Sequence, residues 1–65
     1  MFNKVTGKLT IVFKEEVEGK KIYVKEDDIN VLMKFEDEIA DKKFFKLTPS
    51  TYVAVDNIAY FTIGL

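Results

Sequence analysis

The sequence predicts an α+β fold in the order β-β-α-β-β(-β), with one helix packed on one face of a small, mainly antiparallel sheet. Three observations support this prediction. Residues 4–14 and 20–25 alternate between apolar and polar side chains, as half-buried strands do. Residues 29–43 have helical spacing, and residues 44–63 are rich in β-branched and aromatic residues. With 65 residues and no internal linker or repeat, residues 1–65 are expected to form a single small domain.

The first predicted strand, residues 4–14, has one clearly apolar face. Gly7 falls on that face, where a bulge or the close approach of another element is expected. The apolar side chains that we expect to point inward are Val5, Leu9, Ile11 and Phe13.

A charged turn over residues 15–19 is predicted to connect this strand to the second one, and to make the pair an antiparallel hairpin. Gly19 suits a positive φ angle within that turn. In the second strand, residues 20–25, we expect Ile22 and Val24 to point inward and Tyr23 to point outward.

The helix is predicted over residues 29–43. A carboxylate of Asp27-Asp28 can accept the free N–H groups of its first turn. Lys42 and Lys43 have the charge that the C-terminal end of a helix favours. Because apolar residues also alternate over residues 29–35, a strand there is the alternative. The side chains predicted for the apolar face are Ile29, Leu32, Met33, Phe35, Ile39 and Ala40.

The C-terminal part of the chain is predicted to supply the remaining strands. Asp56 is the single charged side chain in residues 51–65. The run 58–63 is apolar on both of its faces, so we expect cover on both sides. The predicted strands cover residues 44–47, 52–55 and 58–63, separated by a turn at 48–51 that contains Pro49 and by a short link at Asp56-Asn57.

One helix can cover only one face of a sheet, so the opposite face is predicted to present an apolar patch that marks an interface. The alternative is a sheet that curls into a small barrel and buries these residues internally. The residues predicted to form the interface are Val12, Tyr23, Tyr52, Ala54, Tyr60, Phe61 and Ile63.

The residue types that are missing exclude several classes of function. The chain contains no His, Cys, Trp, Arg or Gln. Without His or Cys, catalytic triads, disulfides and the usual zinc clusters cannot form. The acidic clusters fall in predicted turns and on the polar face of the predicted helix, as solvated charges do. We therefore expect no enzymatic activity, no cofactor and no metal site.

A basic and aromatic cluster, residues 42–46, supports an alternative function. Ammonium groups can contact phosphates while an aromatic ring stacks on a base, as in proteins that bind single-stranded nucleic acid. The net charge of −1 and the absence of arginine weigh against this function. One of Phe44 and Phe45 is expected to face the core. The residues assigned to this alternative, a small nucleic-acid-binding regulator, are Lys42, Lys43, Phe45 and Lys46.

The sequence therefore predicts a non-enzymatic protein–protein interaction module that forms a homo-oligomer or docks another protein through its C-terminal strands. Its size, and a residue usage typical of AT-rich genomes, lead us to expect an accessory or inhibitory protein of a phage or mobile element. No apolar run approaches the ~18 residues of a membrane span. The first thirteen residues lack the features of a signal peptide, so a cytoplasmic location is expected.

Overall fold

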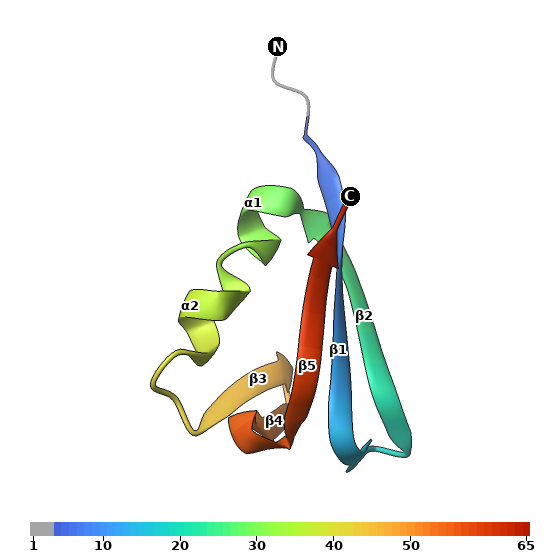
Figure 1. Ribbon diagram of the computed structural model, residues 1–65, viewed down its shortest axis with the longest axis vertical. Helices are drawn as coiled ribbons and strands as arrows, with labels where there is room; N and C mark the ends of the chain where they lie inside the picture. Colours follow the sequence, from blue (N-terminus) through green and yellow to red (C-terminus); the bar gives the residue numbers. More distant parts are fainter. Residues whose placement is uncertain (1–3) are drawn as a thin grey trace.

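The computed structural model describes residues 4–65, and its five strands form two antiparallel sheets (Figure 1). One sheet has the strand order β2-β1-β5, and β3 pairs with β4 in the other. The α+β class is confirmed, and no barrel closes among the strands of the described residues. The absence of a signal peptide was predicted partly from residues 1–3, which lie outside this range. The strands are β1 (Thr6–Val17), β2 (Lys20–Asp28), β3 (Phe44–Thr48), β4 (Thr51–Ala54) and β5 (Ile58–Gly64).

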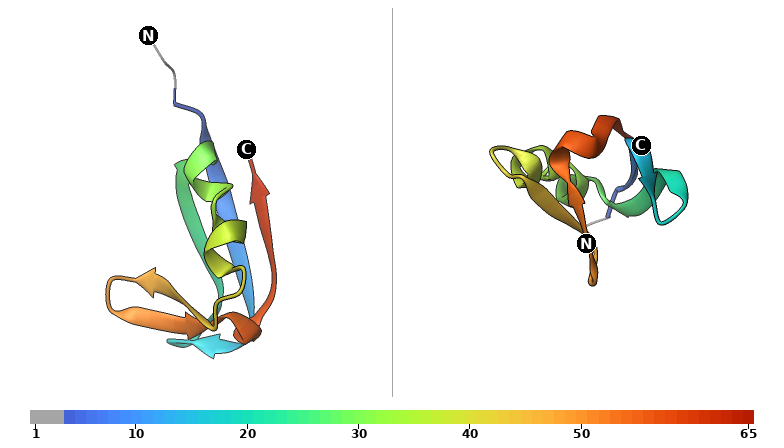
Figure 2. Two further views of the ribbon diagram at one scale, coloured as in Figure 1. Left: turned by 90° about the vertical axis from the view of Figure 1, so that its left-hand side faces the viewer. Right: turned by 90° about the horizontal axis from the view of Figure 1, so that it is seen from below.

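The helical residues lie along one face of the three-stranded sheet (Figures 1 and 2). Two short helices, α1 (Ile29–Leu32) and α2 (Phe35–Ile39), follow β2, and a 3-10 turn, η1 (Val55–Asn57), joins β4 to β5. The strand alternative for residues 29–35 is therefore wrong. Within residues 4–65, neither helix has the length and apolar character needed to cross a membrane.

Strand β1 is the centre of the three-stranded sheet, and its inward face is the one that the sequence predicts. Gly7, Leu9, Ile11 and Phe13 are all buried. Val5 precedes the strand and is exposed, but its carbonyl oxygen accepts a hydrogen bond of 2.8 Å from the backbone N–H of Ile29. The start of α1 is thus fixed to the start of β1.

The turn between β1 and β2 is shorter than predicted, because β1 continues to Val17. Glu18 and Gly19 have φ angles of 52° and 79°. Positive φ at both central residues is typical of the tight turns that match the twist of a hairpin. The positive φ predicted for Gly19 is confirmed.

The side chains of β2 face the opposite way from the prediction. Tyr23 lies directly opposite the buried Ile11 and packs on the core, whereas Ile22 and Val24 are exposed. Val17 pairs with Lys20 at the turn. If this pairing continued without interruption, Val24 would lie opposite Phe13, and Val24 would point inward. An irregularity between Val12 and Val17 shifts the pairing by an odd number of residues. An odd shift exchanges the two faces of a strand, which corrects the prediction.

A second irregularity changes the faces of β5. Tyr60 pairs with Val12, but the next pair joins Phe13 to Ile58, so Ala59 is the extra residue. Ile58 therefore packs on the core together with Phe61 and Ile63, although strict alternation along the strand would place it on the same face as Tyr60. The expectation that this strand needs cover on both faces is corrected, because its large apolar side chains other than Tyr60 pack on the core.

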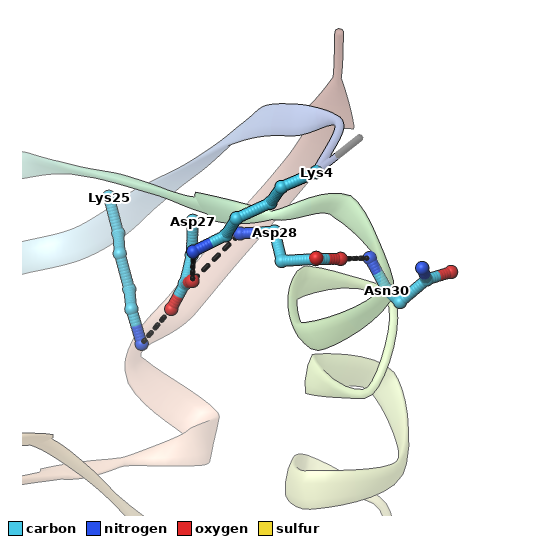
Figure 3. A network of polar contacts seen from close by, with 5 residues as sticks. All are labelled: Lys4, Lys25, Asp27, Asp28 and Asn30. Carbon is cyan, nitrogen blue, oxygen red and sulfur yellow. Dashed lines mark hydrogen bonds and ion pairs between the residues drawn. The ribbon is translucent and has the colours of Figure 1, made fainter. Parts of the chain in front are cut away.

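The start of α1 is stabilised by the predicted cap. Oδ1 of Asp28 accepts a hydrogen bond of 2.8 Å from the backbone N–H of Asn30 (Figure 3). The preceding carboxylate, Asp27, accepts from the N–H of Asp28 at 2.7 Å. Asp27 also lies 3.8 Å from Nζ of Lys4 and 4.0 Å from Nζ of Lys25. These two long, largely exposed ion pairs contribute little to stability.

The helical segment ends earlier than predicted. Ala40 has extended backbone angles and Asp41 has a positive φ of 58°, so residues after Ile39 leave the helix. Lys42 and Lys43 were predicted to close the last helical turn, but they lie in the connection to β3. The chain reverses here in order to begin β3, and a helix continued to Lys43 could not make that reversal.

The core joins the two sheets through an aromatic cluster beneath α2. The ring of Phe35 meets Phe45 of β3 edge-to-face at 5.5 Å and Phe61 of β5 edge-to-face at 5.0 Å between centroids. Edge-to-face contacts stabilise a core beyond the area that they bury. The buried apolar side chains of the core are Leu9, Ile11, Phe13, Leu32, Phe35, Phe45 and Val53.

Candidate docking surfaces

The side of the three-stranded sheet opposite the helices, called here the outer face, carries a small apolar patch. Residues that lie directly opposite each other in antiparallel strands share a face. Val12 of β1 lies between Ile22 of β2 and Tyr60 of β5, and Thr10 lies between Val24 and Thr62 in the next row. Ile22, Val24 and Tyr60 are each at least half exposed. The outer face is thus apolar at its centre, as predicted, but only Val12 and Tyr60 of the residues predicted for the interface lie there.

The seven residues predicted for the interface do not form one surface. Val12 and Tyr60 are neighbours on the outer face. Tyr23, Phe61 and Ile63 lie on the helix side of the sheet and pack on the core. The remaining two, Tyr52 and Ala54, lie on the exposed side of the β3–β4 hairpin.

Ile22 and Val24 belong to the outer face and were missed by the sequence reasoning. The sequence shows their alternation with Tyr23, but the alternation of one strand does not say which of its faces points inward. The short turn at Glu18-Gly19 would not have corrected this, because the irregularity further along the hairpin decides the face.

The two edges of the three-stranded sheet differ sharply in charge. Six of the nine residues of β2 are charged, whereas none of the seven residues of β5 is. Figure 2 shows β5 along one margin of the molecule, and no other element that the structure describes lies along its outer edge. The charged residues of β2 are Lys20, Lys21, Lys25, Glu26, Asp27 and Asp28.

The basic and aromatic cluster opens onto a groove between α2 and the β3–β4 hairpin, called here the hairpin groove, with a volume of about 500 Å³. Its rim carries Lys25, Glu38, Lys42, Phe44, Lys46 and Tyr52.

One of the two phenylalanines in that cluster faces the core, as predicted. Phe45 is only 7% exposed and forms the floor of the hairpin groove, whereas Phe44 is 59% exposed. Phe45 therefore cannot offer its ring to a base, which corrects its assignment to the nucleic-acid site. Lys43 is exposed but does not line the groove. Its backbone carbonyl accepts a hydrogen bond of 2.8 Å from the N–H of Val55.

The acidic side chains do not gather into a cation site in the described part of the chain. Within residues 4–65, no three carboxylates lie close enough together to hold a metal ion. The contacts that Asp27 and Asp28 make are those of the helix start, as described above.

Comparisons with known proteins assign no family to this chain. No protein-family model matches it, no curated protein matches its sequence and no solved structure matches its fold. The function must therefore be inferred from the chain's own surfaces and their chemistry.

Proposed function

We propose that this chain is a non-enzymatic protein-interaction module that pairs with a second copy of itself through the outer edge of β5. The observation that carries the proposal is the contrast in charge between the two edges of the three-stranded sheet. The more specific role, an accessory or inhibitory protein of a phage or mobile element, stays a prediction from size and residue usage.

An edge strand presents unpaired N–H and C=O groups, and proteins commonly protect such edges with charged side chains, lysine above all. The β2 edge has this protection, with Lys20, Lys21 and Lys25 among its residues. The β5 edge lacks it, and its sequence, Ile58–Gly64, is rich in residues that favour strands. Addition of a further strand is therefore favoured at β5 and opposed at β2.

A second copy of β5 suits this edge in geometry and in charge. Antiparallel pairing of two identical edge strands places a twofold axis perpendicular to the sheet, and such isologous contacts are the commonest kind in homodimers. The axis keeps the helices of both copies on the same side, so that Tyr60 and Thr62 of both copies share the outer face. Since β5 has no charged residue, no like charges meet across the new pair.

The experiment compares two lysine substitutions in one row of the outer face. Thr62 and Val24 flank Thr10 from opposite edges, and both are exposed. In Thr62→Lys, the introduced ammonium group and its symmetry mate lie close together across the paired strands, so we expect dissociation. In Val24→Lys, the charge lies at the other edge, so the dimer should persist.

Light scattering coupled to size exclusion, over a range of concentrations, measures the outcome. The wild-type chain should reach twice its single-chain mass of 7.5 kDa, as should Val24→Lys, while Thr62→Lys remains at the single-chain mass. A wild-type chain that stays single at every concentration contradicts the proposal. So does a dimer that survives Thr62→Lys, or one that Val24→Lys disrupts equally, which would indicate packing between outer faces.

A further inference from the structure

We propose that the hairpin groove binds single-stranded nucleic acid, with Phe44 and Tyr52 stacking on bases and Lys25, Lys42 and Lys46 contacting phosphates. This site does not depend on pairing at β5. It differs from the site expected from sequence, because Phe44 and Tyr52 take the part assigned to Phe45.

The charge in the groove is opposite to that of the whole chain. Three lysines and one glutamate, Glu38, line it, although the chain has a net charge of −1. The ion pairs among residues 4–65 join Lys4 and Lys25 to Asp27, and they do not include Lys42 or Lys46. These two ammonium groups are thus available to an anionic ligand, and their contact with phosphates releases the cations condensed on the nucleic acid.

Two exposed aromatic rings lie beside these lysines on the same side of the hairpin. Tyr52 lies directly opposite Lys46, and Phe44 precedes Lys46 by two residues, so all three share one face. Because Phe44 pairs with Ala54, Tyr52 is its diagonal neighbour, at a typical separation of roughly 7–8 Å. Phe44 is 59% exposed and Tyr52 is 63% exposed.

The contact between Lys46 and Tyr52 places an ammonium group that can bind a phosphate beside a ring that can stack on a base. Nζ of Lys46 lies 5.6 Å from the centroid of the Tyr52 ring, within the range of a cation–π contact. A nucleotide that stacks on this ring would bring its phosphate to the same ammonium group. The groove volume of about 500 Å³ lies in the range of small-ligand sites, roughly 300–1,000 Å³, and can accept a base with its sugar.

A single strand fits this arrangement better than a duplex. Exposed rings bind bases whose faces are free, and the bases of a duplex are already stacked on one another. The chain also has no arginine, the preferred residue for bidentate recognition of guanine edges. The expected binding is therefore tolerant of sequence and sensitive to salt.

The test uses fluorescence anisotropy of a labelled thymidine oligonucleotide with the full chain. Tyr52→Ala should weaken binding by about fivefold to a hundredfold, which corresponds to the loss of one stacked base. Lys46→Glu should weaken binding and make it less sensitive to salt. Lys21→Glu is the matched control, because it makes the same charge change on an exposed lysine of β2 that does not line the groove. It should change affinity much less than Lys46→Glu.

The side chains of Tyr52, Lys46 and Lys21 are all exposed, so we expect each variant to fold. Thermal unfolding of each variant checks this. The proposal is overturned if the wild-type chain does not bind at low salt, or if Tyr52→Ala and Lys46→Glu bind no more weakly than Lys21→Glu. Equal affinity for heparin would reassign the groove to polyanions in general. Equal affinity for duplex DNA or for thymidine monophosphate would likewise contradict a site for single strands.

Discussion

The side-chain amide of Asn57 pairs with both backbone polar groups of Glu15. Oδ1 of Asn57 accepts a hydrogen bond of 2.8 Å from the N–H of Glu15, and Nδ2 donates one of 3.0 Å to its carbonyl oxygen. The contact lies just beyond the Phe13–Ile58 pair, where the ladder between β1 and β5 ends. Asn57 thus continues the ladder with its side chain and fixes η1 against β1.

Replacement of Asn57 by alanine should lower the free energy of unfolding by about 1–2 kcal/mol, because two partly exposed hydrogen bonds are lost. Asn57→Asp should cost at least as much, since a carboxylate can accept from the N–H of Glu15 but repels its carbonyl oxygen. Urea denaturation measures both. Asn30→Ala is the matched control, since Asn30 bonds to Asp28 through its backbone N–H, which alanine retains. Equal stability of the two alanine variants would contradict a role for the Asn57 side chain.

Gly7 allows α1 to approach β1 closely, and a side chain there should destabilise the fold. A Cβ atom on Gly7 would lie 2.5 Å from Cδ1 of Ile29 and 3.0 Å from the carbonyl oxygen of Gly64. Gly7→Ala should therefore lower the free energy of unfolding by about 1–3 kcal/mol, as overpacking does. Adding Ile29→Val removes the clashing methyl group and should recover part of this loss.

The same substitution at Gly64 provides the control for that experiment. A Cβ atom on Gly64 would have no neighbour within 4 Å, so Gly64→Ala should change stability little or raise it slightly. The measurement is the urea midpoint of all three variants. If Gly7→Ala were as stable as Gly64→Ala, the close approach of α1 to β1 would not exist in solution.

The features that sequence predicted correctly depend on neighbours along the chain. Gly19 in a turn, Asp28 at a helix start and Pro49 between two strands each follow from local backbone chemistry. The order of elements follows from the same kind of signal. The inward face of β1 was also predictable, because Leu9, Ile11 and Phe13 make one face apolar whereas the other face carries Lys8 and Lys14.

The features that sequence missed depend on pairing between distant residues. The faces of β2 and β5 are set by irregular pairing beside Val12, which neither strand's own alternation reveals. The end of the helix at Ile39 is set by the reversal at Asp41, although Lys42 and Lys43 are compatible with a helix. The outer face was therefore only half predicted. Val12 and Tyr60 were expected there, whereas Ile22 and Val24 were missed because the irregular pairing sets the face of β2.

Because β2 packs Tyr23 and not Val24 on the core, substitutions of these two adjacent residues should change the free energy of unfolding to different extents. Tyr23→Thr should lower the free energy of unfolding by about 1–3 kcal/mol, somewhat less than the loss of a fully buried aromatic ring, because Tyr23 is half-buried against Ile11. Val24→Thr replaces one β-branched side chain by another on the exposed outer face and should stay within about 0.5 kcal/mol of the wild type. Urea denaturation at low protein concentration separates these effects from self-association. A larger loss for Val24→Thr than for Tyr23→Thr would mean that β2 presents the other face to the core, with Val24 opposite Phe13 as the unbroken hairpin pairing would require.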